Sequence, residues 1–144
     1  MKIGAGILPI VCLAFALNGC STSKPASFSH TTAPGWATVE IRDGVDYDRA
    51  WDTVFSILAR EFDFSTVFKD DGYIQTGWLY TWSGVYQENY RVRVTVKFPQ
   101  DRKSVQVRSE AWALDGRAWV IGTDSRLMTT LKTDLMGTVG RTTR

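Results

Sequence analysis

The sequence predicts an α+β fold, a two-layer sandwich in which two helices cover one face of an antiparallel sheet. Two patterns predict it. Apolar residues recur at helical spacing in two segments, and between these segments they alternate along four successive stretches. A sheet with one apolar face needs that face covered, and two amphipathic helices can cover it. The expected order is helix, four-strand meander and helix, and a leading fifth strand at the sheet edge, around Val39 and Ile41, is an open addition.

The first helix is expected to begin after Asp46. Asp46 is a suitable N-cap, and Asp48 would lie in the first turn, where the helix dipole favours an acidic side chain. One face of the predicted helix is apolar, and its residues follow at steps of four, three, one, three and four: Tyr47, Trp51, Val54, Phe55, Leu58 and Phe62. The same spacing predicts a second helix through Leu127, Leu131, Leu135 and Val139, capped by Asp124 or Thr123.

The first two strands are expected over residues 64–69 and 73–78, joined by Asp70, Asp71 and Gly72. A three-residue hairpin loop with glycine in its last, left-handed position is a favoured type. It pairs Lys69 with Tyr73, which places Phe68 beside Ile74 and Phe64 beside Trp78. Both apolar sets then lie on the core side, as a correct register requires.

The third strand is expected over residues 88–98 and, after a polar connection over residues 99–104, the fourth from 105 to about 113. If residues 83–85 form the preceding turn, Ile74 opposes Val94 and Trp78 opposes Tyr90. Packing Val107 beside Val96 then pairs Arg93 with Glu110 and Arg91 with Trp112, on the face away from the core. The first is an expected cross-strand ion pair and the second an expected cation–π contact.

This outer face of the sheet allows two interpretations. It is either a solvated face stabilised by its own cross-strand pairs or a docking surface for a protein partner, because interfaces favour Arg, Tyr and Trp. The candidate partner-binding residues are Tyr73, Arg91, Arg93, Arg108 and Trp112.

A second candidate site is the aromatic hairpin tip between the second and third strands. Tyr80, Trp82 and Tyr86 are expected there, beyond the meander and partly exposed. An aromatic pair that caps the core would explain them. The alternatives are insertion among lipid headgroups, contact with a partner groove, or stacking on a glycan.

The expected domain lacks the residues that several kinds of catalytic and metal site require. The chain has two cysteines, Cys12 and Cys20, and one histidine, His30, and all three precede the expected domain. Nucleophilic catalysis by Ser/His/Asp or Cys/His, and zinc sites of Cys and His, are therefore not expected inside it. No glycine-rich phosphate loop follows a strand. We expect no enzyme activity, no metal and no cofactor.

The carboxylates of the expected domain do not indicate a catalytic or metal site either. Asp70 and Asp71 are explained by the turn. The acidic residues near the start of the first helix are explained by its dipole, with calcium as an alternative that lacks the EF-hand spacing; they are Asp43, Asp46, Asp48 and Asp52. Without Lys2, 16 Lys and Arg face 15 Asp and Glu, and this near-neutral balance argues against nucleic acid as a partner.

The beginning of the chain resembles a bacterial lipoprotein signal peptide. Lys2 precedes an apolar stretch over residues 3–17, and Leu17, Asn18 and Gly19 lead to Cys20 as in a lipobox. As a helix that stretch would span about 22 Å, too short for a hydrocarbon core of about 30 Å. The alternative is an ordinary secretory signal with an incidental cysteine. The resemblance implies cleavage after residue 19 and diacylglycerol and N-acyl chains on Cys20.

The expected domains are the signal peptide (1–19), a lipidated disordered tether (20–35), one α+β domain (36–141) and a short tail (142–144). The tether is rich in Ser, Thr, Pro and Ala and would hold the domain about 20 Å from the lipid. Ser21 follows Cys20, and in such lipoproteins the absence of Asp there implies the outer membrane. We expect the protein to be anchored to that membrane and to face the periplasm.

The expected domain resembles helix-grip domains. Ala50, Trp51, Leu58 and the run Asp71, Gly72, Ile74, Thr76 and Trp78 are also similar to the repeat unit of BamC-type outer-membrane assembly lipoproteins. This resemblance covers about 45 residues. The two resemblances imply a non-enzymatic envelope lipoprotein that acts as an accessory or scaffold for a protein partner. The alternative is a helix-grip module for an apolar or glycan ligand, with a cavity lined by Trp51, Phe55, Trp78 and Leu131. The sequence leaves the oligomeric state open.

Overall fold

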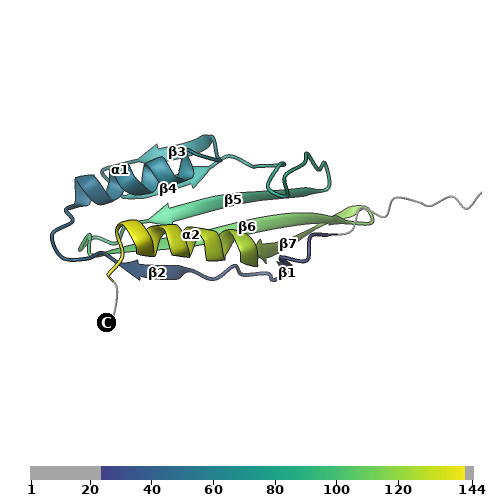
Figure 1. Cartoon of the computed structure of the whole chain (residues 1–144). Coiled ribbons are helices and arrows are strands. Elements are labelled where there is room, and N and C mark those ends of the chain that lie inside the picture. Colours follow the sequence, from purple (N-terminus) through teal and green to yellow (C-terminus); the bar gives the residue numbers. More distant parts are fainter. Residues whose placement is uncertain (1–23, 142–144) are drawn as a thin grey trace, which may run out of the picture.

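The computed structural model describes residues 24–141. The predicted signal peptide, Cys20 and the tail at 142–144 lie outside the described residues. The fold is α+β, as predicted, with one mostly antiparallel sheet and two helices that pack on the same face of it (Figure 1). Among residues 24–141, no helix is long and apolar enough to cross a membrane.

The sheet has seven strands in the order β1-β7-β6-β5-β4-β3, and β2 pairs with β6 outside this path. Strand β6 is the longest: its first part pairs with β2 and its last part with β7. The strands are β1 (Phe28–His30), β2 (Ala37–Glu40), β3 (Phe64–Phe68), β4 (Tyr73–Thr76), β5 (Tyr90–Lys97), β6 (Ser104–Asp115) and β7 (Ala118–Asp124).

Both helices begin at the predicted N-caps. Helix α1 (Tyr47–Leu58) begins after Asp46, whose carboxylate accepts a hydrogen bond from the Arg49 amide. Helix α2 (Ser125–Thr138) begins after Asp124, whose carboxylate accepts from the Leu127 amide. Each cap satisfies an amide that has no partner within its helix.

The core lies between the helices and the sheet. Strands β5 and β6 contribute alternating residues, such as Val94 and Val107, which are fully buried. Helix α1 adds Trp51, which is 4% exposed and packs 5.7 Å from the ring of Phe98. Helix α2 adds Leu127, Leu131 and Leu135, so the predicted apolar faces of both helices point inward.

The meander has five strands instead of the predicted four. Residues after Ala113 continue β6 to Asp115, and a two-residue loop of Gly116 and Arg117 turns the chain into β7. Gly116 has a φ of 63°, a left-handed conformation suited to a tight hairpin loop. The optional leading strand exists as β2.

Two predicted registers are wrong, and they differ in consequence. Phe68 pairs with Tyr73 across a four-residue loop, one position from the prediction, which leaves Phe68 57% exposed. Ile74 pairs with Val96 instead of Val94. The second register is shifted by two residues. Because side chains alternate along a strand, a shift of two leaves each side chain on the face that was predicted for it.

The expectation of a disordered tether over residues 20–35 is wrong for the part that the structure describes. Strand β1 pairs with β7 there, and Phe28 packs edge-on against Tyr90 with ring centroids 6.1 Å apart. Ser27 donates a 2.8 Å hydrogen bond to the Asp124 carboxylate. The composition of this segment is that of a spacer, but pairing with an edge strand absent from the prediction orders it.

Candidate functional site

The candidate site is the face of the sheet opposite the helices, where cationic and tryptophan side chains gather. Strand alternation directs the even-numbered residues of β5 into the core and therefore turns Arg91, Arg93 and Lys97 to this outer face. We call the whole set the arginine–tryptophan face; it comprises Trp36, Trp78, Arg91, Arg93, Lys97, Arg108, Trp112 and Trp119.

Both predicted cross-strand pairs on this face are confirmed. Arg93 is opposite Glu110, and its Nε lies 2.6 Å from the glutamate oxygen. Arg91 is opposite Trp112, with its guanidinium carbon 4.9 Å from the ring centroid. The register of β5 and β6 was predicted correctly along its whole length.

Arg91 lies at the centre of a larger aromatic cluster than the sequence predicts. Its guanidinium carbon is also 4.6 Å from the ring centroids of both Trp78 and Trp119. Its Nη1 donates a 3.0 Å hydrogen bond to the Tyr80 hydroxyl. An arginine held among three indole rings is restrained in one orientation, which limits the entropy lost when a partner binds.

A second cation–aromatic group lies at the other end of the same face. The guanidinium carbon of Arg108 is 4.6 Å from the ring centroid of Trp36, and the Lys97 ammonium is 5.0 Å from the same ring. The Lys97 ammonium also lies 6.0 Å from the ring of Tyr73. Trp36 is 37% exposed, so this end of the face is open to solvent.

Three nitrogen donors on this face are buried without a hydrogen-bond partner. They are Nε of Arg91, Nε of Arg108 and Nε1 of Trp112. Buried donors without partners cost free energy, and such groups in a folded protein need an explanation. For the two arginines, cation–π contacts with the indole rings offset part of this cost.

The structure therefore brings the five predicted partner-binding residues onto one face, Tyr73 through its pairing with Lys97, and adds Lys97 and three tryptophans to them. Trp78 was predicted in the core and is instead on the outer face, 4.5 Å from the guanidinium carbon of Arg93. The prediction failed because the chain leaves β4 at Thr76 and pairs again only at Leu79, which bridges to Val92.

The predicted aromatic tip divides between the two sides of the molecule. Tyr80 and Tyr86 stack with ring centroids 5.8 Å apart, and Tyr86 is 65% exposed. Trp82 turns to the helix side, where the guanidinium carbon of Arg126 lies 5.0 Å from its ring centroid. The aromatic pair of the tip is thus formed by the two tyrosines, beside Arg91.

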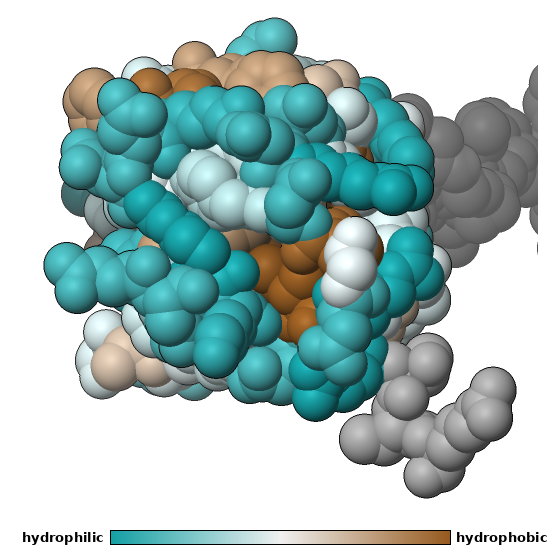
Figure 2. Space-filling model, turned by 90° about the vertical axis from the view of Figure 1, so that its left-hand side faces the viewer, coloured by the Kyte–Doolittle hydropathy of each residue, from teal (hydrophilic) through white to brown (hydrophobic). Residues whose placement is uncertain are grey.

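The cavity that would favour a helix-grip module is not formed as expected. Trp51 packs on Phe98 and Phe55 stacks on Phe64, with ring centroids 4.2 Å apart. An open groove of about 430 Å³ lies instead between the end of α1 and the start of α2. Its apolar lining includes Phe62, Trp82 and Leu131. At the other end of the molecule, Figure 2 shows a small apolar depression ringed by polar side chains.

The acidic residues near α1 have structural partners. Asp46 caps the helix, Asp48 lies 3.0 Å from the Lys69 ammonium, and Asp43 lies 2.8 Å from Arg141. The hydrogen bond that the Lys69 ammonium donates to the Asp48 carboxylate raises the pKa of Lys69. Within residues 24–141, no group of three or more acidic, histidine or cysteine side chains could hold a metal ion.

One buried polar group joins the N-terminal segment to α2. The Asp124 carboxylate accepts hydrogen bonds from the hydroxyls of Tyr90 and Ser27 as well as from the helix. Burial first, and the hydrogen bond to Asp124 second, raise the pKa of Tyr90 far above its usual value. Because each member has a packing or capping role, we assign this group to stability.

Comparison with known proteins adds no assignment to this geometry. No protein-family model matches the chain, and a search of curated proteins found no match to it.

Proposed function

We propose that this protein is a non-enzymatic lipoprotein of the bacterial envelope, anchored through Cys20 and binding a protein partner with its arginine–tryptophan face. The observation that carries the partner role is Arg91, held among three indole rings on the uncovered face of the sheet. The anchor rests on the lipobox resemblance, which also supports the outer membrane as its location and the periplasm as the side it faces.

The charges on this face favour an acidic segment of the partner. Four cations lie on it (Arg91, Arg93, Lys97 and Arg108), and Glu110 pairs with one of them. Arginine beside tryptophan is a combination typical of the residues that carry binding energy in protein interfaces. An acidic partner would be attracted by the uncompensated cations, and aromatic rings would supply apolar contact.

The test combines substitution with recovery of the partner. In Arg91→Ala combined with Trp112→Ala, co-purification of the partner should be lost while the cooperative thermal unfolding transition remains. Lys132→Ala, an exposed cation on α2, is the matched control and should retain the partner.

A charge-reversal variant keeps this test independent of folding. Arg108→Glu places an anion beside Trp36 without removing a core side chain, and it should weaken partner binding more at low salt than at high salt. Unchanged partner recovery in both variants would contradict the proposal.

A second candidate function is a binding module for an apolar or glycan ligand, favoured by the groove between the helices. Nε1 of Trp82, a residue that lines this groove, is a buried donor without a partner. A ligand acceptor could satisfy it while the ligand contacts Phe62 and Leu131. Saturable thermal stabilisation by a fatty acid or an oligosaccharide, lost in Trp82→Phe, would support this function.

A further inference from the structure

The N-terminal segment is clamped to one end of the domain. The Lys24 ammonium pairs with Asp115, which ends β6 at its hairpin with β7. Three residues later, Ser27 binds Asp124, and the Ser27 carbonyl accepts a 2.9 Å hydrogen bond from the Ser125 amide. The chain therefore reaches the described part of the structure at the β6–β7 hairpin end, as Figure 1 shows.

This clamp shortens the connection to Cys20. Three residues lie between Cys20 and Lys24, so their Cα atoms are four steps apart and at most about 14 Å from each other. The headgroup layer of one leaflet is itself roughly 5–8 Å thick. If Cys20 carries lipid, the β6–β7 hairpin end must lie at or next to the membrane surface.

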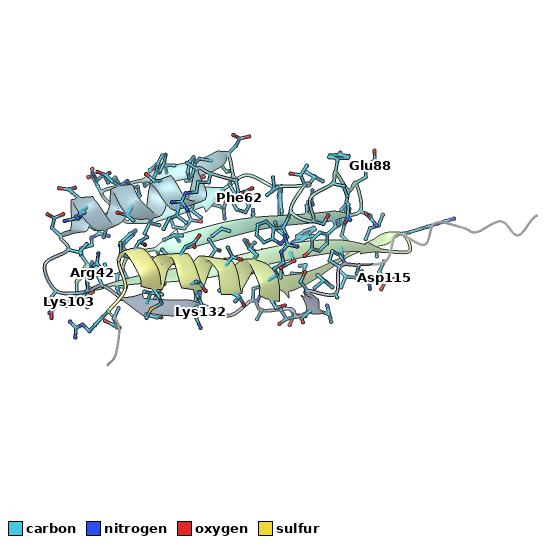
Figure 3. The ribbon with its side chains drawn as sticks, in the orientation of Figure 1. Arg42, Phe62, Glu88, Lys103, Asp115 and Lys132 are labelled. Carbon is cyan, nitrogen blue, oxygen red and sulfur yellow. The ribbon has the colours of Figure 1, made fainter. Side chains whose placement is uncertain are left out.

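The aromatic tip lies at the same end of the molecule. Figure 3 places Glu88, which follows the tip, at the same end of the molecule as Asp115, the partner of Lys24, whereas Lys103 is at the opposite end. Val85 and Tyr86 are 64% and 65% exposed, more than the other exposed large apolar residues described. An apolar side chain beside a tyrosine suits the boundary between headgroups and acyl chains.

We infer that the domain stands end-on on the membrane, with Val85 and Tyr86 inserted into the headgroup layer beside the anchor. This inference rests on the proposed lipidation of Cys20, and it assigns the tip to a lipid surface. Charge contributes little, because exposed Arg117 at the hairpin is offset by Glu88 at the same end. The orientation leaves the arginine–tryptophan face to the side, accessible to a partner.

Because the lipid anchor already holds the protein on the membrane, a tip that inserts weakly is sufficient to orient the domain. Two side chains bury too little apolar surface to bind a vesicle on their own. An attached lipid, however, holds them within reach of the bilayer and makes insertion an intramolecular step. The tip therefore sets the orientation of the domain, and the lipid supplies the affinity.

The test uses the full lipidated protein in vesicles of phosphatidylethanolamine and phosphatidylglycerol. Val85→Cys and, as the matched control at the opposite end, Lys103→Cys each carry an environment-sensitive fluorophore. We expect the label at position 85 to shift to shorter wavelength and to be quenched several-fold more strongly by a quencher-bearing lipid than the label at position 103.

Two readouts separate the possible failures. Mass spectrometry of the N-terminal peptide and flotation with vesicles report the anchor itself, so an unlipidated protein that does not float overturns both the anchor and the orientation. A lipidated, floating protein whose two labels are quenched equally, or not at all, overturns only the end-on orientation. Quenching at position 85 by an acidic protein instead of by lipid would assign the tip to the partner and also overturn it.

Discussion

The two faces of the sheet use the same strands for different purposes. On the inner face, Val92, Val94 and Val96 of β5 are at most 1% exposed under the helices. On the outer face, the side chain of Arg93, between two of those valines, is 27% exposed and lies over Trp78. No helix or strand of the described residues covers this second face, although it carries several tryptophans. The contrast indicates that the inner face holds the fold together and the outer face is available for recognition.

The largest effect should come from truncating the inner face. Trp51→Ala removes a buried ring that packs against both Tyr47 and Phe98, and burial of this size makes the expected loss of unfolding free energy about 3–5 kcal/mol. Urea denaturation followed by circular dichroism measures it. Phe68→Ala, at an exposed position, should cost less than about 0.5 kcal/mol, and equal losses would erase the distinction between buried and exposed aromatic residues.

The next effect concerns the buried group that connects the inner face to strand β1. Asp124→Ala removes the α2 cap and leaves the hydroxyl of Tyr90 without its acceptor, so we expect a loss of about 2–4 kcal/mol. Hydrogen exchange should show that the amides of β1 lose protection in this variant. Retained protection of Ser29 and of Thr31, whose amide donates to the Ile121 carbonyl, would mean that strand pairing alone orders the segment.

Alkaline pH should lower the free energy of unfolding through Tyr90, a member of the same buried group. The pKa of Tyr90 in the folded protein is raised above that of an unfolded tyrosine, mainly by burial. Above about pH 10 the unfolded chain releases this proton while the folded chain keeps it. The free energy of unfolding then falls by about 1.4 kcal/mol per pH unit, and below pH 9 it changes little from this cause. Denaturation of Tyr90→Phe over the same pH range should lack this component, and identical slopes in the two proteins would contradict the assignment.

The smallest effect on stability is expected on the outer face. Arg91→Ala removes cation–π contacts that are partly open to solvent, and we expect it to cost about 1 kcal/mol. Chemical denaturation beside a binding assay would show a modest loss of stability with a large loss of partner affinity. A loss comparable to that of Trp51→Ala would mean that the outer face is a second core.

The sequence predicted those parts of the fold that depend on local signals. Helix caps at Asp46 and Asp124 followed from residue type and spacing, and the β5–β6 register followed from matching two alternating strands. Strand β7 was missed although Asp115 and Gly116 precede Trp119, Val120 and Ile121, a pattern typical of a hairpin. Without β7, the pairing of β1 could not be predicted, because the sequence of an edge strand does not indicate which strand it pairs with.

Half of the candidate site followed from the sequence and half did not. Arg91, Arg93 and Trp112 were placed correctly because regular alternation continues through β5 and β6. Trp78 was misplaced because the chain departs from regular pairing after Thr76, and Trp119 was missed together with β7. Trp36 reaches the face only because β2 pairs with β6, a contact between segments distant in the sequence. Arg91 is therefore surrounded by more aromatic rings than the sequence predicted.

The most direct test of the contrast between the two faces is site-specific crosslinking in cells. A photoreactive amino acid replaces Gln106 of β6, which lies opposite Lys97 of the arginine–tryptophan face, and in a second strain it replaces Lys132 on α2. We predict a discrete adduct from position 106, with an acidic partner peptide at the crosslink and loss of the adduct in Arg91→Ala combined with Trp112→Ala. Equal adducts from both positions, or an adduct from position 132 alone, would contradict the assignment of recognition to the outer face.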